Sequence, residues 1–396
     1  MKFRAVLLTA LVAGTVGQVS AQTVITDPDD LLGKDNAITT AVPFLAITPD
    51  ARSAAMGDAG VATAPDANSA YWNAAKLVFI DKSRGGSVSY TPWLGKIVND
   101  MWVGYLSGFM KLSQEQAIGM SLKYFDLGDI SFRDVNNVSL GDFNPREFAI
   151  DATYSRMLSE SLSLGGSLRY IHSNLTGAFA GIDAKPGNSV AVDFGIYYTK
   201  PIESSAKGST ISFGGSISNI GAKLSYTDGE NRDFIPTTLR FGSAFTTNLD
   251  PYNTITFTLD FSKLMVPTPP IRDTNGDIIA GKDDDRPLLS GMFGSFSDAP
   301  NGFEEEIDEV MTSIGIEYWY NKVFAGRLGY FNEAATKGNR KYLTVGVGFR
   351  KDRFGFDVAY IVPTNKREHP LAETLRFTLL FQIDQTTLER EESVTD

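Results

Sequence analysis

The sequence predicts an all-β protein, a transmembrane antiparallel β-barrel of about 14 strands whose lumen holds an N-terminal plug. One observation is alternation: from 161 to 170 the even positions carry Leu, Gly or Tyr, and the odd positions carry Ser, Gly or Arg. A second is length, because such segments run for about 10 residues, longer than most strands of soluble sheets. A third is a secretory leader. A soluble sandwich also alternates, but these features together favour a membrane barrel.

The leader occupies the start of the chain. Lys2 and Arg4 precede an apolar run, and Val19-Ser20-Ala21 is a small-residue cleavage signature. We therefore expect a signal peptide at 1–21 and an N-terminal periplasmic segment at 22–41. The chain contains no Cys, which excludes a disulfide and a cysteine nucleophile.

The next stretch, 42–85, is expected to form the plug, or hatch. Small residues dominate it, and neither the two-residue period of a strand nor the apolar stripe of a helix persists beyond a turn or two. Such compact irregular backbone is tolerated at membrane depth only where protein or water satisfies it, as inside a barrel. We expect Trp72 and Asn73 to be buried against the barrel wall, and polar groups such as Asp66 to complement its charges.

The barrel itself is expected over 86–384, followed by an acidic C-terminal tail at 385–396. Alternating segments start near residues 86, 100, 116, 146, 160, 188, 209, 237, 254, 312, 322, 341, 353 and 373. Their number is even, as in bacterial outer-membrane barrels, which join strands by short periplasmic turns and longer external loops. If the chain enters from the periplasm, with both termini there, every long gap is external: 93–99, 126–145, 173–187, 220–236, 264–311, 333–340 and 363–372.

Charges of both signs fall on the predicted inner face. The candidate lumen network comprises Asp151, Arg169, Asp193, Arg240, Asp260, Arg327 and Arg376, with Glu147, Glu317 and Asp357 on the same face. Turned to lipid, a charge costs about 2 to 4 kcal/mol at mid-depth. We therefore expect these groups to pair with one another and with the plug; a specific hydrophilic transport path has no support in the sequence.

Two features of the long gap 264–311 stand out. Asp273, Asn275 and Asp277 offer oxygens in the manner of a calcium loop, but the bidentate Glu of such a loop is missing, and an Asn-Gly turn in a solvated acidic loop is the preferred interpretation. No metal site is therefore assigned. Further on, Phe303, Ile307 and Val310 have helical spacing, which predicts a short helix on the external rim and a candidate docking face or lid.

Enzyme and nucleic-acid functions find little support. The chain has two His, His172 and His369, and adjacent strand residues point to opposite faces, so His172 and Ser173 do not form a catalytic pair by themselves. We predict no enzyme activity and no cofactor. The formal net charge of −11 argues against nucleic acid, because an acidic chain repels phosphates.

The plug region carries a resemblance. VPFLAITPDARSAAMGDAGVATAPDANSAYWNAAK is similar to the opening of the PorV (LptO) family, the FadL-like outer-membrane components of type IX secretion systems. That family usually has Pro where this chain has Ala74. The similarity extends through the strands and into SFSDAPNGFEEEI at 295–307.

The resemblance implies an outer-membrane barrel that binds the C-terminal domain of secreted cargo as it leaves a large translocon barrel. It would then deliver the cargo to a surface sortase and attachment complex, in contact with outer-membrane lipid or lipopolysaccharide. A link to lipopolysaccharide modification is also implied, and an indirect effect would explain it equally well. Two alternatives stay open: FadL-type uptake of hydrophobic compounds such as long-chain fatty acids, and a Ser-His lipid hydrolase. The charged inner face favours the first hypothesis over uptake.

Overall fold

The computed structural model describes residues 37–383, except 95–99, 135, 176–184, 204, 206–207, 228–231 and 365–373. The expected signal peptide, most of the 22–41 segment, the acidic tail and His369 lie outside these residues. No helix among the described residues is long and apolar enough to cross a membrane.

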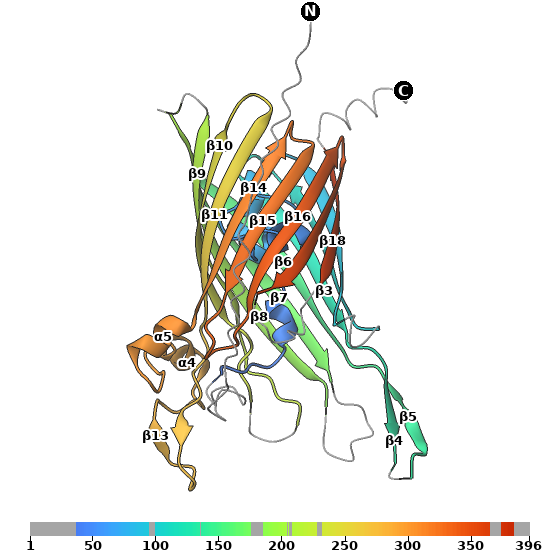
Figure 1. The fold of residues 1–396 in the computed structure, drawn as a ribbon, viewed down its shortest axis with the longest axis vertical. Coiled ribbons are helices and arrows are strands. Elements are labelled where there is room, and N and C mark those ends of the chain that lie inside the picture. Colours follow the sequence, from blue (N-terminus) through green and yellow to red (C-terminus); the bar gives the residue numbers. More distant parts are fainter. Residues whose placement is uncertain are drawn as a thin grey trace, which may run out of the picture. The chain divides into compact units, whose positions relative to one another are not determined.

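Fourteen strands close into one barrel, and each pairs antiparallel with its two neighbours (Figure 1). The ring closes where the first strand pairs with the last. The strands are β1 (Arg84–Pro92), β2 (Trp102–Lys111), β3 (Gln116–Asp126), β6 (Arg146–Ser159), β7 (Leu162–Asn174), β8 (Gly187–Ile202), β9 (Ser209–Gly221), β10 (Thr238–Asn248), β11 (Asn253–Leu264), β14 (Val310–Tyr320), β15 (Phe324–Asn332), β16 (Lys341–Lys351), β17 (Phe354–Pro363) and β18 (Leu375–Ile383).

The predicted fold class is confirmed. Every barrel strand begins within about two residues of its predicted start, because closure of the ring keeps the alternation between buried and exposed side chains along each strand. The alternation predicted none of four short additional strands. These form two hairpins within the long links, β4 (Ile130–Arg133) with β5 (Ser139–Phe143) and β12 (Ile271–Arg272) with β13 (Ile278–Ala280).

The two ends of the barrel differ. At one end the strands are joined by tight turns, as between β14 and β15 or β16 and β17, where Asn321, Lys322 and Asp352 have positive φ. We call this the short-turn end. The other, the long-link end, carries both extra hairpins and the helices α4 (Leu288–Gly294) and α5 (Phe303–Asp308) (Figure 1).

Residues 41–80 fill the lumen as short helices joined by irregular backbone, which confirms the predicted plug (Figure 1). The helices are η1 (Pro43–Ala46), α2 (Ala51–Ala54), α3 (Ser69–Trp72) and η2 (Ala74–Phe79). The plug runs lengthwise: Ala41 donates a backbone hydrogen bond to Phe234 in the link after β9, whereas Ile80 leads into the short-turn end of β1. Ala41, the last residue of the expected periplasmic segment, therefore lies at the long-link end.

Plug and wall touch backbone to backbone at two glycines. Gly57 has φ +69°, and a Cβ there would lie 2.5 Å from the carbonyl oxygen of Tyr330. On β15, a Cβ at Gly329 would lie 2.1 Å from the backbone nitrogen of Gly57. Any side chain at either position would push the plug off the wall.

Candidate functional site

Arg52 of the plug joins two acidic groups. Its guanidinium donates to both carboxylate oxygens of Glu317 on β14, at 2.9 and 2.8 Å, and to Asp66 of the plug at 2.8 Å. Glu317 also accepts from Arg327 at 2.7 Å, and Arg327 donates to Asp357 at 2.8 Å. A chain of alternating charges therefore runs from the plug across neighbouring strands. We call these five residues the plug-wall ion network.

Arg52 and Glu317 pair with each other only while the plug lies inside the barrel, so the network favours that position of the plug. The side chains of Arg52 and Glu317 are 8% and 3% exposed, so removing either one takes from the other a buried partner of opposite charge. Sequence analysis placed Asp66 and Arg327 in separate groups and did not assign a role to Arg52. In the sequence, Arg52 stands out only as a basic residue within a stretch of small residues.

Three predicted residues meet in a second cluster within the wall. Arg169 on β7 pairs with Asp151 on β6 at 2.5 Å and with Asp193 on β8 at 2.9 Å. Asn219 on β9, which sequence analysis missed, accepts a hydrogen bond from Arg169 and donates its backbone N–H to Asp193 at 2.7 Å. This cluster links four adjacent strands from inside the barrel.

Asp260 and Asn73 connect wall and plug through backbone groups. Asp260 on β11 accepts the backbone N–H of Gly60 at 2.7 Å and of Val61 at 2.8 Å. Asn73 donates its side-chain amide to the carbonyl of Ile196 on β8 at 2.9 Å. The two Asp260 bonds satisfy backbone N–H groups of the irregular plug, whereas the Asn73 bond ties the plug to a backbone carbonyl of the wall.

Arg240 and Arg376 do not join the Arg169 cluster. Arg240 lies over the ring of Trp72, with its guanidinium carbon 5.7 Å from the ring centroid, and it donates to Ser218 at 2.9 Å. Arg376 donates to the carbonyl of Thr48 in the plug at 2.7 Å. The predicted lumen network is thus divided between wall and plug.

Lys123 on β3 was missed by sequence analysis. Its ammonium donates to the plug carbonyls of Leu45, at 3.1 Å, and Ile47. Lys123 lies two residues after Ser121 in an alternating segment, so both side chains face the lumen. This spacing could have identified Lys123 from the sequence. Trp72 is 4% exposed and donates to Asp50, another polar group of the plug, at 2.7 Å.

Towards the long-link end the lumen is filled by apolar groups. Phe44 and Leu45 of the plug are 1% and 3% exposed and pack against the inner face of the wall. Their neighbours include Val103, Phe125, Ala149, Ile171, Ala191, Leu224 and Ile235. The lumen therefore combines a charged middle with an apolar end.

Outside the lumen, α5 is held against the rim by buried ion pairs. Glu305 pairs with Lys337 at 2.5 Å and Glu306 with Lys263 at 3.1 Å. Glu309, just after the helix, pairs with Lys337 at 2.9 Å and with Lys263. We call these five residues the rim clasp. It orients a short helix that hydrogen bonds of its own would hold weakly.

The opposite face of α5 is apolar and exposed. Phe303 is 78% and Ile307 is 55% exposed, and Phe296, which lines the same groove, is 45% exposed. A groove of about 270 Å³ separates them from the outer wall. Val310, expected in the same helix, is the first residue of β14 and lines this groove, since α5 ends at Asp308.

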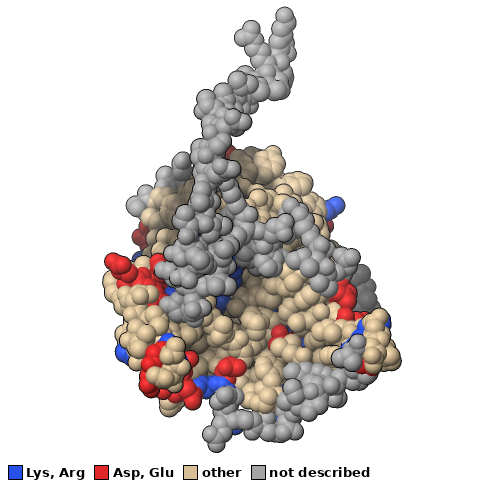
Figure 2. All heavy atoms as spheres, turned by 60° about the horizontal axis from the view of Figure 1, so that its bottom comes forward, with Lys and Arg blue, Asp and Glu red and all other residues tan. Residues whose placement is uncertain are grey.

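The acidic hairpin β12–β13 has the structure of a turn. Asp273 accepts backbone N–H groups from Asn275 and Asp277, both at 2.9 Å, around Gly276 at φ +90°. Within the described ranges, no three Asp, Glu or His side chains gather as a metal site would require. Figure 2, with the long-link end turned forward, shows acidic side chains gathered in patches near its edge.

His172 and Ser173 face different environments. Ser173 is fully buried and donates to Glu147 inside the barrel at 2.6 Å, whereas the ring of His172 bonds Asn188 at 2.8 Å on the exposed side. The alternation along β7 therefore separates the two side chains that a hydrolase would need together.

Comparison with solved structures finds chains that align over most of their length at low identity. The Ralstonia pickettii toluene transporter TbuX aligns with a TM-score of 0.47 and 13% identity, covering 85% of this chain and 98% of that one. A FadL homologue of Pseudomonas aeruginosa aligns with a TM-score of 0.44 and 10% identity, covering 88% and 99%. Among curated proteins, no sequence matches.

Comparison with protein families is more specific. Residues 32–271 match the family described as type IX secretion system protein PorV. The match includes the plug and the strands from β1 to β11, the region that holds the Arg169 cluster and Asp260. Since it spans more than half of the sequence, this outer-membrane barrel belongs to the PorV family of the type IX secretion system.

Proposed function

We propose that the protein binds secreted cargo by its C-terminal signal domain as the cargo leaves the translocon, and passes it to the surface sortase and attachment complex. The observation that carries the proposal is the rim clasp. It holds α5 in place while leaving Phe303 and Ile307 exposed at the long-link end. Apolar side chains held rigid and exposed favour protein docking, because little entropy is lost when a partner covers them.

The proposal includes an orientation. We place the short-turn end in the periplasm and the long-link end outside the cell, as outer-membrane barrels commonly have short periplasmic turns and long external loops. The partner-binding links are then 126–145, 220–236 and 264–311, whose length exceeds what joining two strands requires. The rim helix lies in the longest of them.

One observation favours a second candidate function. The lumen around Phe44, Leu45 and Phe125 is apolar, which is the lining that FadL-type uptake of a hydrophobic compound would need once the plug moved aside. Against this, the plug-wall ion network lies further along the same lumen, and a hydrophobic compound crossing it would separate buried ion pairs. Cargo binding at the rim requires no such step.

A deletion strain separates these functions. We expect loss of the protein to leave cargo unprocessed and unanchored on a surface-cargo blot, with long-chain fatty-acid uptake unchanged. Replacing His172, Ser173 and His369 together by Ala should leave anchoring intact, whereas a Ser-His hydrolase would behave as in the deletion. Normal cargo anchoring in the deletion strain would end the type IX proposal, and lost uptake with normal anchoring would support the transporter.

The docking face is tested by pull-down of a cargo C-terminal domain. The variant F303S/I307S should lose capture at least as fully as deletion of 268–302, while the barrel stays folded, because both side chains are exposed. Ile279→Ser on β13 is the matched control, since Ile279 is 65% exposed in the same link. Unchanged capture after F303S/I307S and after deletion of each of the three long links would contradict docking at this end.

A further inference from the structure

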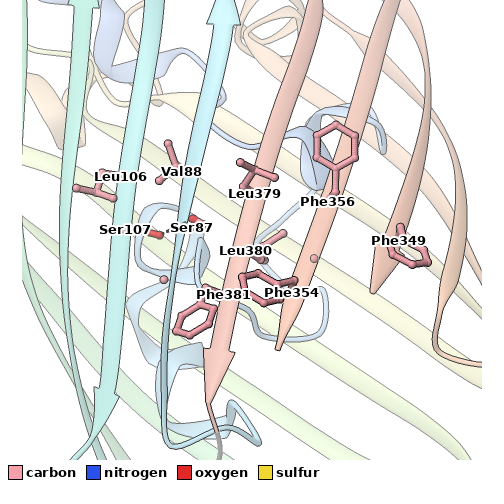
Figure 3. Close-up of a pocket in the computed structure, with 12 residues that line it drawn as sticks. Ser87, Val88, Leu106, Ser107, Phe349, Phe354, Phe356, Leu379, Leu380 and Phe381 are labelled. Carbon is pink, nitrogen blue, oxygen red and sulfur yellow. Dashed lines mark hydrogen bonds between the residues drawn. The ribbon is translucent and has the colours of Figure 1, made fainter. Parts of the chain in front are cut away.

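The outer face of the barrel carries a groove where the ring closes. It has a volume of about 450 Å³ and follows β1 and β18 towards the short-turn end (Figure 3). The side chains that project around it are apolar; they are Val88, Leu106, Phe349, Phe354, Phe356, Leu379 and Phe381. Ser87 and Ser107, drawn beside it, hydrogen-bond each other at 2.8 Å and are buried.

The groove exists because two outward positions lack side chains. Gly86 on β1 lines the groove; it pairs with Gly108 on β2, just beside the groove, and with Phe381 on the other side. A Cβ added at Gly108 would meet only the carbonyl oxygen of Gly85, at 3.7 Å. Backbone therefore forms the floor, and aromatic rings form one side.

Two exposed cations flank the groove near the short-turn end. Arg84 lies two residues before Gly86 on the same outer face, about 7 Å along the strand. Lys351 is the cross-strand partner of Phe354, which lines the groove. Between them a phosphate would receive charge-assisted hydrogen bonds from two sides.

We propose that this groove binds one anionic phospholipid of the periplasmic leaflet, with an acyl chain along Val88 and Leu379 and the phosphate between Arg84 and Lys351. The leaflet follows from the orientation proposed above. The occupant is a lipid because an apolar groove on the membrane-facing wall, with Arg84 and Lys351 near its short-turn end, matches an acyl chain attached to an anionic headgroup.

Such a lipid would cover the floor that Gly86 and Gly108 leave bare at the closing strands. Its role would be structural, because covering backbone at membrane depth opposes fraying of β1 from β18. The proposal does not depend on cargo binding, since the groove lies on the outer wall and the rim clasp at the opposite end.

Native mass spectrometry of the full chain in detergent tests the proposal, with phosphatidylglycerol and phosphatidylcholine of identical acyl chains as probes. We expect one phosphatidylglycerol to be retained preferentially. The variant R84Q/K351Q should bind it about 30-fold more weakly, since each Lys or Arg near an anionic lipid contributes about fivefold. Gly108→Leu, which adds a side chain beside Gly86 without a backbone clash, should narrow the groove and weaken the binding of both lipids.

Matched controls stand elsewhere on the outer wall. Lys200→Gln removes an exposed cation at the same end of β8, and Gly326→Leu adds a side chain where a Cβ meets nothing within 4 Å. Both should bind like the parent chain, and the heat-dependent gel mobility of folded barrels confirms folding of each variant. Equal retention of the two lipids, or weakening by the controls to the same degree, would overturn the proposal. A co-purifying protein that occupied the groove in place of lipid would also overturn the proposal.

Discussion

Arg52 and Glu317, 265 residues apart in the chain, form a two-bond ion pair that joins the plug to β14 inside the barrel. Both side chains are almost fully buried. An ion pair of this kind adds little stability compared with apolar packing, but breaking it is costly, because the charge that remains is buried and has lost a partner.

Replacing Arg52 by Met should destabilise the folded barrel by about 3 to 5 kcal/mol, since Glu317 and Asp66 lose a buried partner. Urea unfolding in lipid vesicles measures the change. Arg272→Met is the control, because Arg272 and Asp284 form a pair in which both side chains are 43% exposed. That change should cost less than about 1 kcal/mol, and equal costs at the two sites would contradict the assigned role of Arg52.

Cysteines placed at Ala59 and Ala67 should react slowly with a bulky thiol reagent in intact membranes. Both residues are buried between plug and wall, at 0% and 1% exposure. Thr274→Cys, exposed in the β12–β13 hairpin, supplies the fast reference. Labelling at Ala59 as rapid as at Thr274 would indicate an open channel, and adding R52M should move the two rates towards each other.

Gly329→Ala should displace the plug although Ala is only one methyl larger. Its Cβ would lie 2.1 Å from the backbone nitrogen of Gly57, which cannot move without shifting the plug. Gly326→Ala, three residues away on the same strand with nothing within 4 Å, should be nearly silent. Thiol labelling at Ala59 reads out the displacement, and similar labelling in the two Ala variants would refute the close contact.

The rim clasp should loosen in acid. Although burial opposes ionisation, the hydrogen bond from Lys337 lowers the pKa of Glu305 below its ordinary value of 4.5. A lowered folded pKa adds stability that is present above 4.5 and is lost as the pH falls through the lowered value. Amide exchange of 303–309, corrected for intrinsic rates, should accelerate there. In K337M exchange should be faster at neutral pH and respond less to acid, whereas an identical pH response in both chains would contradict the assignment.

The sequence alone determined the strands and their order. A period of two along each strand is a local property, so the alternation around Leu164 and Leu168 identifies a wall strand without any knowledge of its partners. The same reasoning failed where two local patterns overlap: Val310 fits the helical spacing after Phe303, but it belongs to β14. The two small hairpins carry too few residues for a period to be recognised.

Tertiary structure decided which charge meets which. The two-residue period places Arg240, Asp260 and Arg327 on the inner face, but it does not say which group each side chain contacts. Arg240 contacts an aromatic ring, Asp260 contacts backbone N–H groups and Arg327 contacts a carboxylate. That choice depends on the plug, whose lengthwise course has no periodic signal because small residues allow many backbone paths. Only closure of the ring brings Glu317 to Arg52, since a partner distant in the chain is selected by the geometry of the whole barrel rather than by its neighbours in sequence.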